Sequence, residues 1–286
     1  AGVAVGAAAS GILRQLSDAY LEPGDETVSA EPSFEAYPII SALAGAGLEK
    51  VRGDGLVAPV RELAAACTDR TRLVLLANPN NPTGTAVSRK EVRWLADHLP
   101  EQCLLVVDEA YHEFVTDPLV GTAADLVERH PNVVVLRTFS KAHGLAALRI
   151  GYAVADPSVV VALDKVLVPF SVGSLAQAAA LASLDAGAEM AERVAAVVAE
   201  RTRVIHDLRA TGWDIPGSET NFVWLPVGDG AVVLAVALER GGVVTRPVEG
   251  EGVRVTVADR AANDRFLEAL AAVTAVAAGG AHRRPA

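Results

Sequence analysis

Three apolar runs of strand length, each ending in polar residues, constrain the fold of this chain more than any other feature of its sequence. Residues 132–136 lead into Arg-Thr-Phe-Ser-Lys141, residues 72–77 lead into a stretch rich in Asn, Pro and Gly, and residues 103–107 end at Asp108. Unbroken aliphatic runs of this length are typical of parallel strands that are buried on both faces. Because open α/β sheets carry their chemistry at the carboxyl ends of the strands, we expect a site where these runs end.

The pattern along the chain predicts two α/β domains. A helical pattern over residues 188–209 is expected to join a large domain, residues 1–190, to a smaller C-terminal domain, residues 191–286. In the smaller domain the spacing of apolar residues predicts a strand, a helix, two strands and a helix, in that order, at residues 220–225, 230–240, 243–246, 252–257 and 263–277. Residues 281–286 are expected to form a disordered tail.

Composition and charge exclude several classes of protein. A hydrophobic fraction of 51% indicates a globular chain with a large core. The formal net charge of −10 argues against nucleic acid or an anionic membrane as the main partner, and no apolar run reaches membrane-spanning length. Cys67 and Cys103 are too few and too poorly spaced for a disulfide framework or a zinc site. We therefore expect a cytoplasmic protein that binds no metal.

The beginning of the chain does not look like a translation start. The single methionine is Met190, and the apolar residues 1–13 lack the basic stretch that opens a signal peptide. We therefore expect Ala1 to lie inside a domain, with an upstream segment outside this sequence.

Two stretches in the first forty residues are suited to binding a flat, phosphorylated ligand. The small residues from Gly6 to Gly11 lead into a helical pattern, and a helix that opens on such a turn offers free N–H groups to a phosphate. An ordinary glycine-bearing helix start remains the alternative, which the sequence alone favours. Phe34 follows a predicted strand at residues 25–30 and can stack on a flat ring, or else anchor the next helix together with Tyr37.

Asp108 and the stretch 78–84 add polar groups beside the strand ends. A carboxylate that ends a buried strand is costly unless a cation pairs with it. The sequence Asn-Pro-Asn-Asn-Pro-Thr-Gly at residues 78–84 forces a rigid, non-helical loop, in which the Asn81–Pro82 bond is a candidate for the cis state. Ser88 is expected to cap a helix that runs through His98.

The segment around Lys141 resembles a known family. Residues 140–152 read Ser-Lys-Ala-x-Gly-Leu-Ala-x-Leu-Arg-x-Gly-Tyr, which is similar to the Schiff-base segment of fold-type I pyridoxal-phosphate (PLP) aminotransferases of class I/II. Residues 78–84 resemble the same family's Asn-Pro-x-Asn-Pro-Thr-Gly motif, and the resemblance extends over residues 5–270. It implies an aspartate aminotransferase-like fold, with a mostly parallel seven-stranded sheet between helices, a smaller C-terminal α/β domain, and the family's N-terminal segment missing. It also implies a homodimer with the active site at the subunit interface.

The resemblance assigns roles residue by residue. Lys141 would hold PLP and act as general base and acid, while Asp108 would keep the pyridine nitrogen protonated. Phe34 would stack on the ring, and Asn81 and Tyr111 would contact its phenolic oxygen. The remaining positions would hold the PLP phosphate (Ala9, Ser10, Thr138, Ser140 and Arg149) or the anionic group of the substrate (Arg246 and Arg254, with Asn81 nearby). For Arg246, a surface arginine on an edge strand is an equally good alternative. The phosphate turn departs from the family's Gly-x-Gly-Ser-x-Glu, with Ala8 and Gly11 at the second glycine and the acidic position.

Within the family, the chain looks most like the aromatic amino acid and histidinol-phosphate aminotransferases. The segments at residues 34–38, 163–170 and 221–225 favour the aromatic branch. The implied reaction moves an amino group from an aromatic amino acid to 2-oxoglutarate or a similar oxo acid. The alternatives are a histidinol-phosphate aminotransferase, another PLP chemistry such as decarboxylation, or a truncated homologue that is weakly active or only binds PLP.

Overall fold

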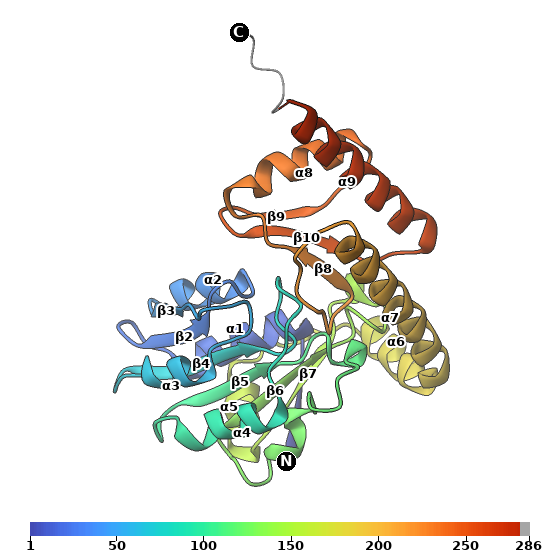
Figure 1. Ribbon diagram of the computed structural model, residues 1–286. Helices are drawn as coiled ribbons and strands as arrows, with labels where there is room; N and C mark the ends of the chain where they lie inside the picture. Colours follow the sequence, from blue (N-terminus) through green and yellow to red (C-terminus); the bar gives the residue numbers. More distant parts are fainter. Residues whose placement is uncertain (281–286) are drawn as a thin grey trace.

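The computed structural model describes residues 1–280 and contains a large and a small sheet (Figure 1). The tail expected at residues 281–286 lies outside the described residues. The large sheet has seven strands, in the order β1 (Gly2–Gly6), β7 (Gly151–Ala155), β6 (Val133–Thr138), β5 (Leu104–Asp108), β4 (Thr71–Ala77), β2 (Glu26–Ala30) and β3 (Gly47–Val51). Strand β7 runs antiparallel to both of its neighbours, and the other pairs are parallel. The expected mostly parallel, seven-stranded sheet is therefore confirmed.

Helices cover both faces of the large sheet, which explains the unbroken apolar runs. Along β4, Leu73 and Leu75 pack on one face against α1 (Ala8–Tyr20), α2 (Ala36–Leu43) and α5 (Pro157–Val166). Val74 and Leu76 pack on the other face with α3 (Val60–Ala65), α4 (Arg89–His98) and the short turn η2 (Ala123–Leu126). Successive side chains of a strand point to opposite faces, so a strand covered on both sides needs apolar residues at every position.

Local sequence signals place several element ends correctly. Helix α4 begins with a capping box, in which the Ser88 hydroxyl accepts a bond from the Glu91 N–H and the Glu91 carboxylate accepts one from the Ser88 N–H. The Asn81–Pro82 bond is cis, as expected. Cys103 is fully buried in the core.

Three expectations about element boundaries were wrong. Strand β1 was not expected, because its Val3 and Val5 are exposed at the sheet edge and give no polar alternation. Helix α1 begins at Ala8, inside the stretch from Gly6 to Gly11 that was expected to precede it. The sequence predicts a strand over residues 148–155 that opens near Arg149. Arg149 instead adopts a left-handed conformation (φ 53°) after the turn η3 (Ala146–Leu148), and β7 starts only at Gly151.

The small sheet follows two helices, α6 (Ser174–Asp185) and α7 (Gly187–Ala210). It is antiparallel, in the order β8 (Phe222–Leu225), β10 (Gly252–Thr256) and β9 (Arg246–Val248), so the strand expected at residues 243–246 begins only at Arg246. One face packs against α7, α8 (Ala231–Arg240) and α9 (Arg260–Gly280). The domain boundary expected between residues 190 and 191 falls inside α7, the helix that leads from the large sheet to the small one. We keep this position as the proposed domain boundary. The remaining short turns are η1 (His112–Phe114) and η4 (Gly228–Gly230).

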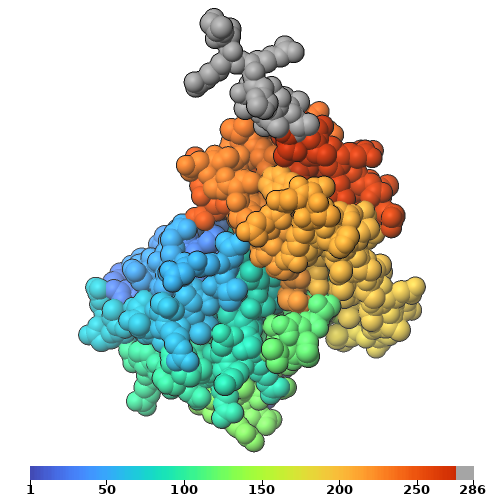
Figure 2. All heavy atoms as spheres, in the orientation of Figure 1, coloured from blue at the N-terminus to red at the C-terminus, as the bar shows by residue number. Residues whose placement is uncertain are grey.

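The part of the chain that forms the small sheet contacts the first strands and helices of the large one. Figure 2 shows the orange atoms of the C-terminal part above the blue atoms of the N-terminal part. Exposed ion pairs join the two parts, Arg246 with Glu35 and Arg52 with Glu251. Among residues 1–280, no helix is long and apolar enough to cross a membrane, and no cluster of His, Cys, Asp or Glu side chains is placed to hold a metal ion.

Candidate active site

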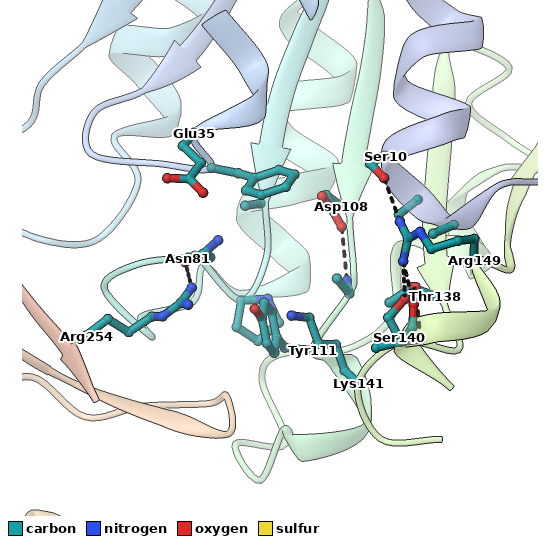
Figure 3. A pocket seen from close by; sticks show the side chains of 17 residues that line it. Ser10, Glu35, Asn81, Asp108, Tyr111, Thr138, Ser140, Lys141, Arg149 and Arg254 are labelled. Carbon is teal, nitrogen blue, oxygen red and sulfur yellow. Dashed lines mark hydrogen bonds between the residues drawn. The ribbon is translucent and has the colours of Figure 1, made fainter. Parts of the chain in front are cut away.

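A pocket of about 300 Å³ lies at the carboxyl ends of β4, β5 and β6 (Figure 3). Parallel strands end at the same edge of a sheet, and β1 points the same way as β6, so the start of α1 reaches this edge too. All of the site residues expected from the sequence line the pocket except Arg246. They are Ala9, Ser10, Phe34, Asn81, Asp108, Tyr111, Thr138, Ser140, Lys141, Arg149 and Arg254.

One corner of the pocket is built to hold an anion. The Arg149 guanidinium donates to the Ser10 hydroxyl at 3.2 Å and lies 3.5 Å from the Ser140 hydroxyl. Thr138 donates from Oγ1 to the Ser140 hydroxyl at 2.9 Å. Helix α1 begins beside these groups, and within the described chain no side chain caps its first N–H groups. A cation, three hydroxyls and a helix N-terminus together fit a phosphate.

Gly151 allows the start of α1 to lie this close to the sheet. A Cβ atom at position 151 would lie 2.8 Å from the Ala9 nitrogen and 2.7 Å from the Arg137 carbonyl oxygen. Any larger residue would therefore push α1 away from β7 and widen the anion corner.

Asp108 is a buried carboxylate that lacks a paired cation. It is 5% exposed, and the N–H of Ala110 donates to it at 3.1 Å. Among the residues that the structure describes, no lysine, arginine or histidine forms an ion pair with it. Burial raises the pKa of Asp108 to about 6, against the opposing effects of the Ala110 N–H and the positive charge of Lys141. The site thus fits a positively charged group placed next to Asp108.

The Tyr111 ring contacts both the Lys141 amine and the Phe222 ring. The Lys141 Nζ atom lies 5.1 Å from the centroid of the Tyr111 ring. Tyr111 packs edge-on against Phe222, with the ring centroids 5.2 Å apart and the planes at 88°. Lys141 itself is exposed, because it follows β6 in a surface turn. Its amine lies in the pocket beside the Tyr111 ring.

Of the three asparagines in the stretch 78–84, Asn81 is the one that faces the pocket. Asn78 exchanges two hydrogen bonds with the backbone of Val87, and the Asn80 amide donates to Pro32 and Thr83. These bonds fix the loop. Asn81 lines the pocket, where its Oδ1 accepts from Arg254 at 2.5 Å.

Arg254 comes to the pocket from β10 of the small sheet. Its guanidinium carbon lies 5.1 Å from the centroid of the Phe222 ring. Its Nε is buried and has no hydrogen-bond partner among the described residues. A buried donor without a partner is unfavourable, so this side chain fits an anionic ligand group.

Arg246, which was expected at the substrate, does not line the pocket. It is 56% exposed on the edge strand β9, and its guanidinium donates to the Glu35 carboxylate at 2.5 Å. Glu35, which follows Phe34, lines the pocket instead. The reason is the tertiary contact between the two sheets, which brings the exposed Arg246 next to the Glu35 carboxylate, 211 residues away along the chain.

Two residues that shape the site, Glu35 and Phe222, were not expected from the sequence. The signal for Glu35 was a charge directly after Phe34, in a segment whose aromatic residues carry the stronger pattern. The signal for Phe222 was a large aromatic residue at the start of a predicted strand, but its position between Tyr111 and Arg254 depends on how the two sheets meet.

The fold and the site together fit a PLP-dependent enzyme of fold-type I. An anion corner, a buried carboxylate suited to a ring cation and an adjacent lysine amine lie at the ends of parallel strands of one α/β sheet. This is the arrangement that a phosphorylated, protonated pyridine aldehyde requires.

Comparison with known proteins identifies the family. Residues 1–270 match the family described as aminotransferase class I and II, and the chain belongs to it. It is 52% identical over 265 residues to the aromatic amino acid aminotransferase of Thermobifida fusca, covering 93% of this chain and 74% of that protein. It is 50% identical over 267 residues to the protein of the same name from Streptomyces avermitilis, with the same two coverages.

Solved structures show the same fold. The histidinol-phosphate aminotransferase of Sinorhizobium meliloti, in complex with pyridoxal-5′-phosphate, is similar with a TM-score of 0.87 at 30% identity. That match covers 96% of this chain and 77% of the other. A mutant aspartate aminotransferase of Thermus thermophilus is similar with a TM-score of 0.83 at 25% identity, covering 95% of this chain and 79% of the other. The aspartate aminotransferase-like fold is thereby confirmed.

Proposed function

We propose that this protein transfers the amino group of an aromatic amino acid to 2-oxoglutarate or a similar oxo acid, with PLP as cofactor. The observation that carries this proposal is that Lys141, the unpaired Asp108 and the Ser10–Ser140–Arg149 corner line one pocket. The aromatic substrate is supported by the names of the relatives that are about half identical to this chain.

The pocket residues fit PLP at both ends. The anion corner, together with the Ala9 backbone and Thr138, would hold the phosphate. Asp108 would pair with the ring nitrogen and keep it protonated, and Phe34 would lie against the ring face. Asn81 and Tyr111 would contact the phenolic oxygen. Bound PLP supplies an electron sink for the bond to be broken at the substrate Cα.

Lys141 is the group that we propose to move the proton. Its amine lies beside Tyr111 in the pocket, where it can take a proton from the substrate Cα and return one during the same half-reaction. The nearby ring of Tyr111 restricts where the amine can lie. Arg254 would bind the substrate carboxylate through its two-pronged guanidinium and so orient Cα toward Lys141.

A homodimer is part of the proposal. An apolar groove of about 680 Å³ runs along β1 and α6, lined by residues such as Val5, Tyr152, Phe170 and Leu181. Phe170 is 98% exposed. Apolar surfaces of this kind are interaction sites, and two-fold dimers are the commonest assemblies. Light scattering at micromolar concentration should show a dimer that Phe170→Glu weakens. A wild-type monomer in the presence of PLP would contradict this part.

Other functions are less well supported. The similarity to the histidinol-phosphate aminotransferase of Sinorhizobium meliloti is at 30% identity, against about 50% for the aromatic enzymes. A decarboxylase or a chain that only binds PLP has no separate observation in its favour. The cytoplasmic location stays a prediction.

A donor screen tests the proposed function directly. Purified protein with PLP should convert phenylalanine, tyrosine or tryptophan to the oxo acid when 2-oxoglutarate is present. The control is the Lys141→Ala variant, which should lose turnover. Release of CO₂ in place of an oxo acid, or a kcat/KM for histidinol phosphate more than about tenfold above that for phenylalanine, would overturn the proposal.

A further inference from the structure

Two arginines are neighbours on the small sheet, and one of them, Arg254, lines the pocket. Arg246 on β9 and Arg254 on β10 are directly opposite each other in the antiparallel pairing. Residues in this relation project from the same face of a sheet. The other face carries the small core, with Val223 and Val255. Both arginines therefore project from the face that carries Phe222, and Arg254 reaches the pocket from there.

Like charges directly opposite each other on a sheet are unfavourable unless each finds a partner. Arg254 uses the Asn81 side-chain oxygen and the Phe222 ring, which are both neutral. Arg246 uses the Glu35 carboxylate at 2.5 Å. Glu35, which lines the pocket, is thus the group that offsets the charge of Arg246 just outside the pocket lining.

Glu35 is placed to act on a ligand as well as on Arg246. It stands at the start of α2, where its side chain makes no capping bond and instead crosses to β9. It follows Phe34 and lines the pocket together with Arg254. The only other carboxylate among the lining residues is Asp108, which is buried at the opposite side beneath the proposed ring position.

We propose that Glu35 is a specificity-determining residue that neutralises Arg246 and so favours amino donors with an uncharged side chain over donors whose side chain ends in a phosphate. The inference rests on the proposed aminotransferase function and deepens it. A phosphate brings nearly two negative charges, which Glu35 would repel and which Arg246 could bind only by leaving Glu35. An aromatic side chain leaves the ion pair undisturbed.

The test compares two donors in four proteins: wild type, Glu35→Gln, Arg246→Gln and the double variant. Glu35→Gln should raise the ratio of kcat/KM for histidinol phosphate to that for phenylalanine by about fivefold, the factor that an exposed ion pair at the top of its usual range supplies. The double variant should lose this gain. Glu35→Gln should also raise kcat/KM for 2-oxoglutarate, whose distal carboxylate carries a single negative charge, but by a smaller factor.

Glu251→Gln is the control, because the Glu251–Arg52 pair also joins the two sheets, also uses an exposed arginine, and lies outside the pocket lining. It should leave the ratio unchanged. The inference is overturned if Glu35→Gln leaves the ratio unchanged, if Glu251→Gln raises it equally, or if the double variant keeps the gain.

A binding measurement separates this inference from the proposed function. Calorimetry with the holoenzyme would compare 3-phenylpropionate with 3-phosphonopropionate, neither of which has an amino group to transfer. Glu35→Gln should tighten only the phosphonate, by about fivefold. If the wild type does not transaminate phenylalanine, the proposed function fails while this titration still tests Glu35. Equal affinity of both proteins for the phosphonate would refute the role of Glu35.

Discussion

Replacing Asp108 by asparagine should stabilise the cofactor-free protein. The carboxyl is 5% exposed, and burial raises its pKa from the ordinary value of 3.8 to about 6. Since a difference of one pH unit corresponds to about 1.4 kcal/mol, the buried charge costs about 3 kcal/mol at neutral pH. Asparagine has nearly the same shape, keeps an oxygen that can accept the Ala110 N–H, and carries no charge.

The pH dependence gives the sign of this effect. Between about pH 4 and pH 6 the folded protein keeps a proton on Asp108 that the unfolded chain has released, so stability falls as the pH rises through this window. Below about pH 4, the free energies of unfolding of the wild type and Asp108→Asn should differ little, because Asp108 is protonated in both the folded and the unfolded state. Above it, Asp108→Asn should be more stable by up to about 3 kcal/mol.

Urea unfolding of both cofactor-free proteins across this pH range is the assay. With PLP added the ranking should reverse, because only the carboxylate can pair with a protonated ring nitrogen. A difference in the free energy of unfolding that does not change with pH would refute the account of Asp108. So would equal stabilisation of the two proteins by PLP.

Three further substitutions test other parts of the site and fold. Arg254→Lys should weaken binding of the donor by about 1.5–3 kcal/mol in steady-state kinetics, since an ammonium cannot reproduce the guanidinium fork; an unchanged KM would contradict this. Gly151→Ala should cost about 1–3 kcal/mol of stability, because its methyl group would collide with the Ala9 nitrogen. It should also weaken PLP binding, measured by fluorescence titration. Unchanged PLP affinity would show that α1 tolerates the shift. Ser88→Ala should lower the free energy of unfolding by about 1 kcal/mol through loss of the α4 cap and leave activity unaltered; a loss of activity would contradict a purely structural role.

The residues at the ends of the central strands could be predicted from the sequence because parallel strands share one edge. Once residues 72–77, 103–107 and 132–136 are recognised as neighbouring buried strands, Asn81, Asp108 and Lys141 must lie near each other. The residues of the anion corner were predicted from the resemblance to the family's motifs, and they too follow strand ends.

The residues that depend on how the two sheets meet could not be predicted in the same way. Arg246 was assigned to the substrate by position in a motif, whereas its rotamer is set by Glu35, which lies 211 residues away along the chain. Phe222 was overlooked for the same reason. Strand β1 was missed because an edge strand of five residues with exposed valines carries no alternating pattern.

The most direct test of the account is to find which lysine PLP attaches to. The protein would be incubated with PLP, reduced with borohydride, digested and examined by mass spectrometry. The account predicts the cofactor on Lys141, and no attachment in Lys141→Ala. The chain holds three other lysines, Lys50, Lys90 and Lys165, none of which lines the pocket. Stoichiometric attachment to any of these, with Lys141 unmodified, would contradict the central claim.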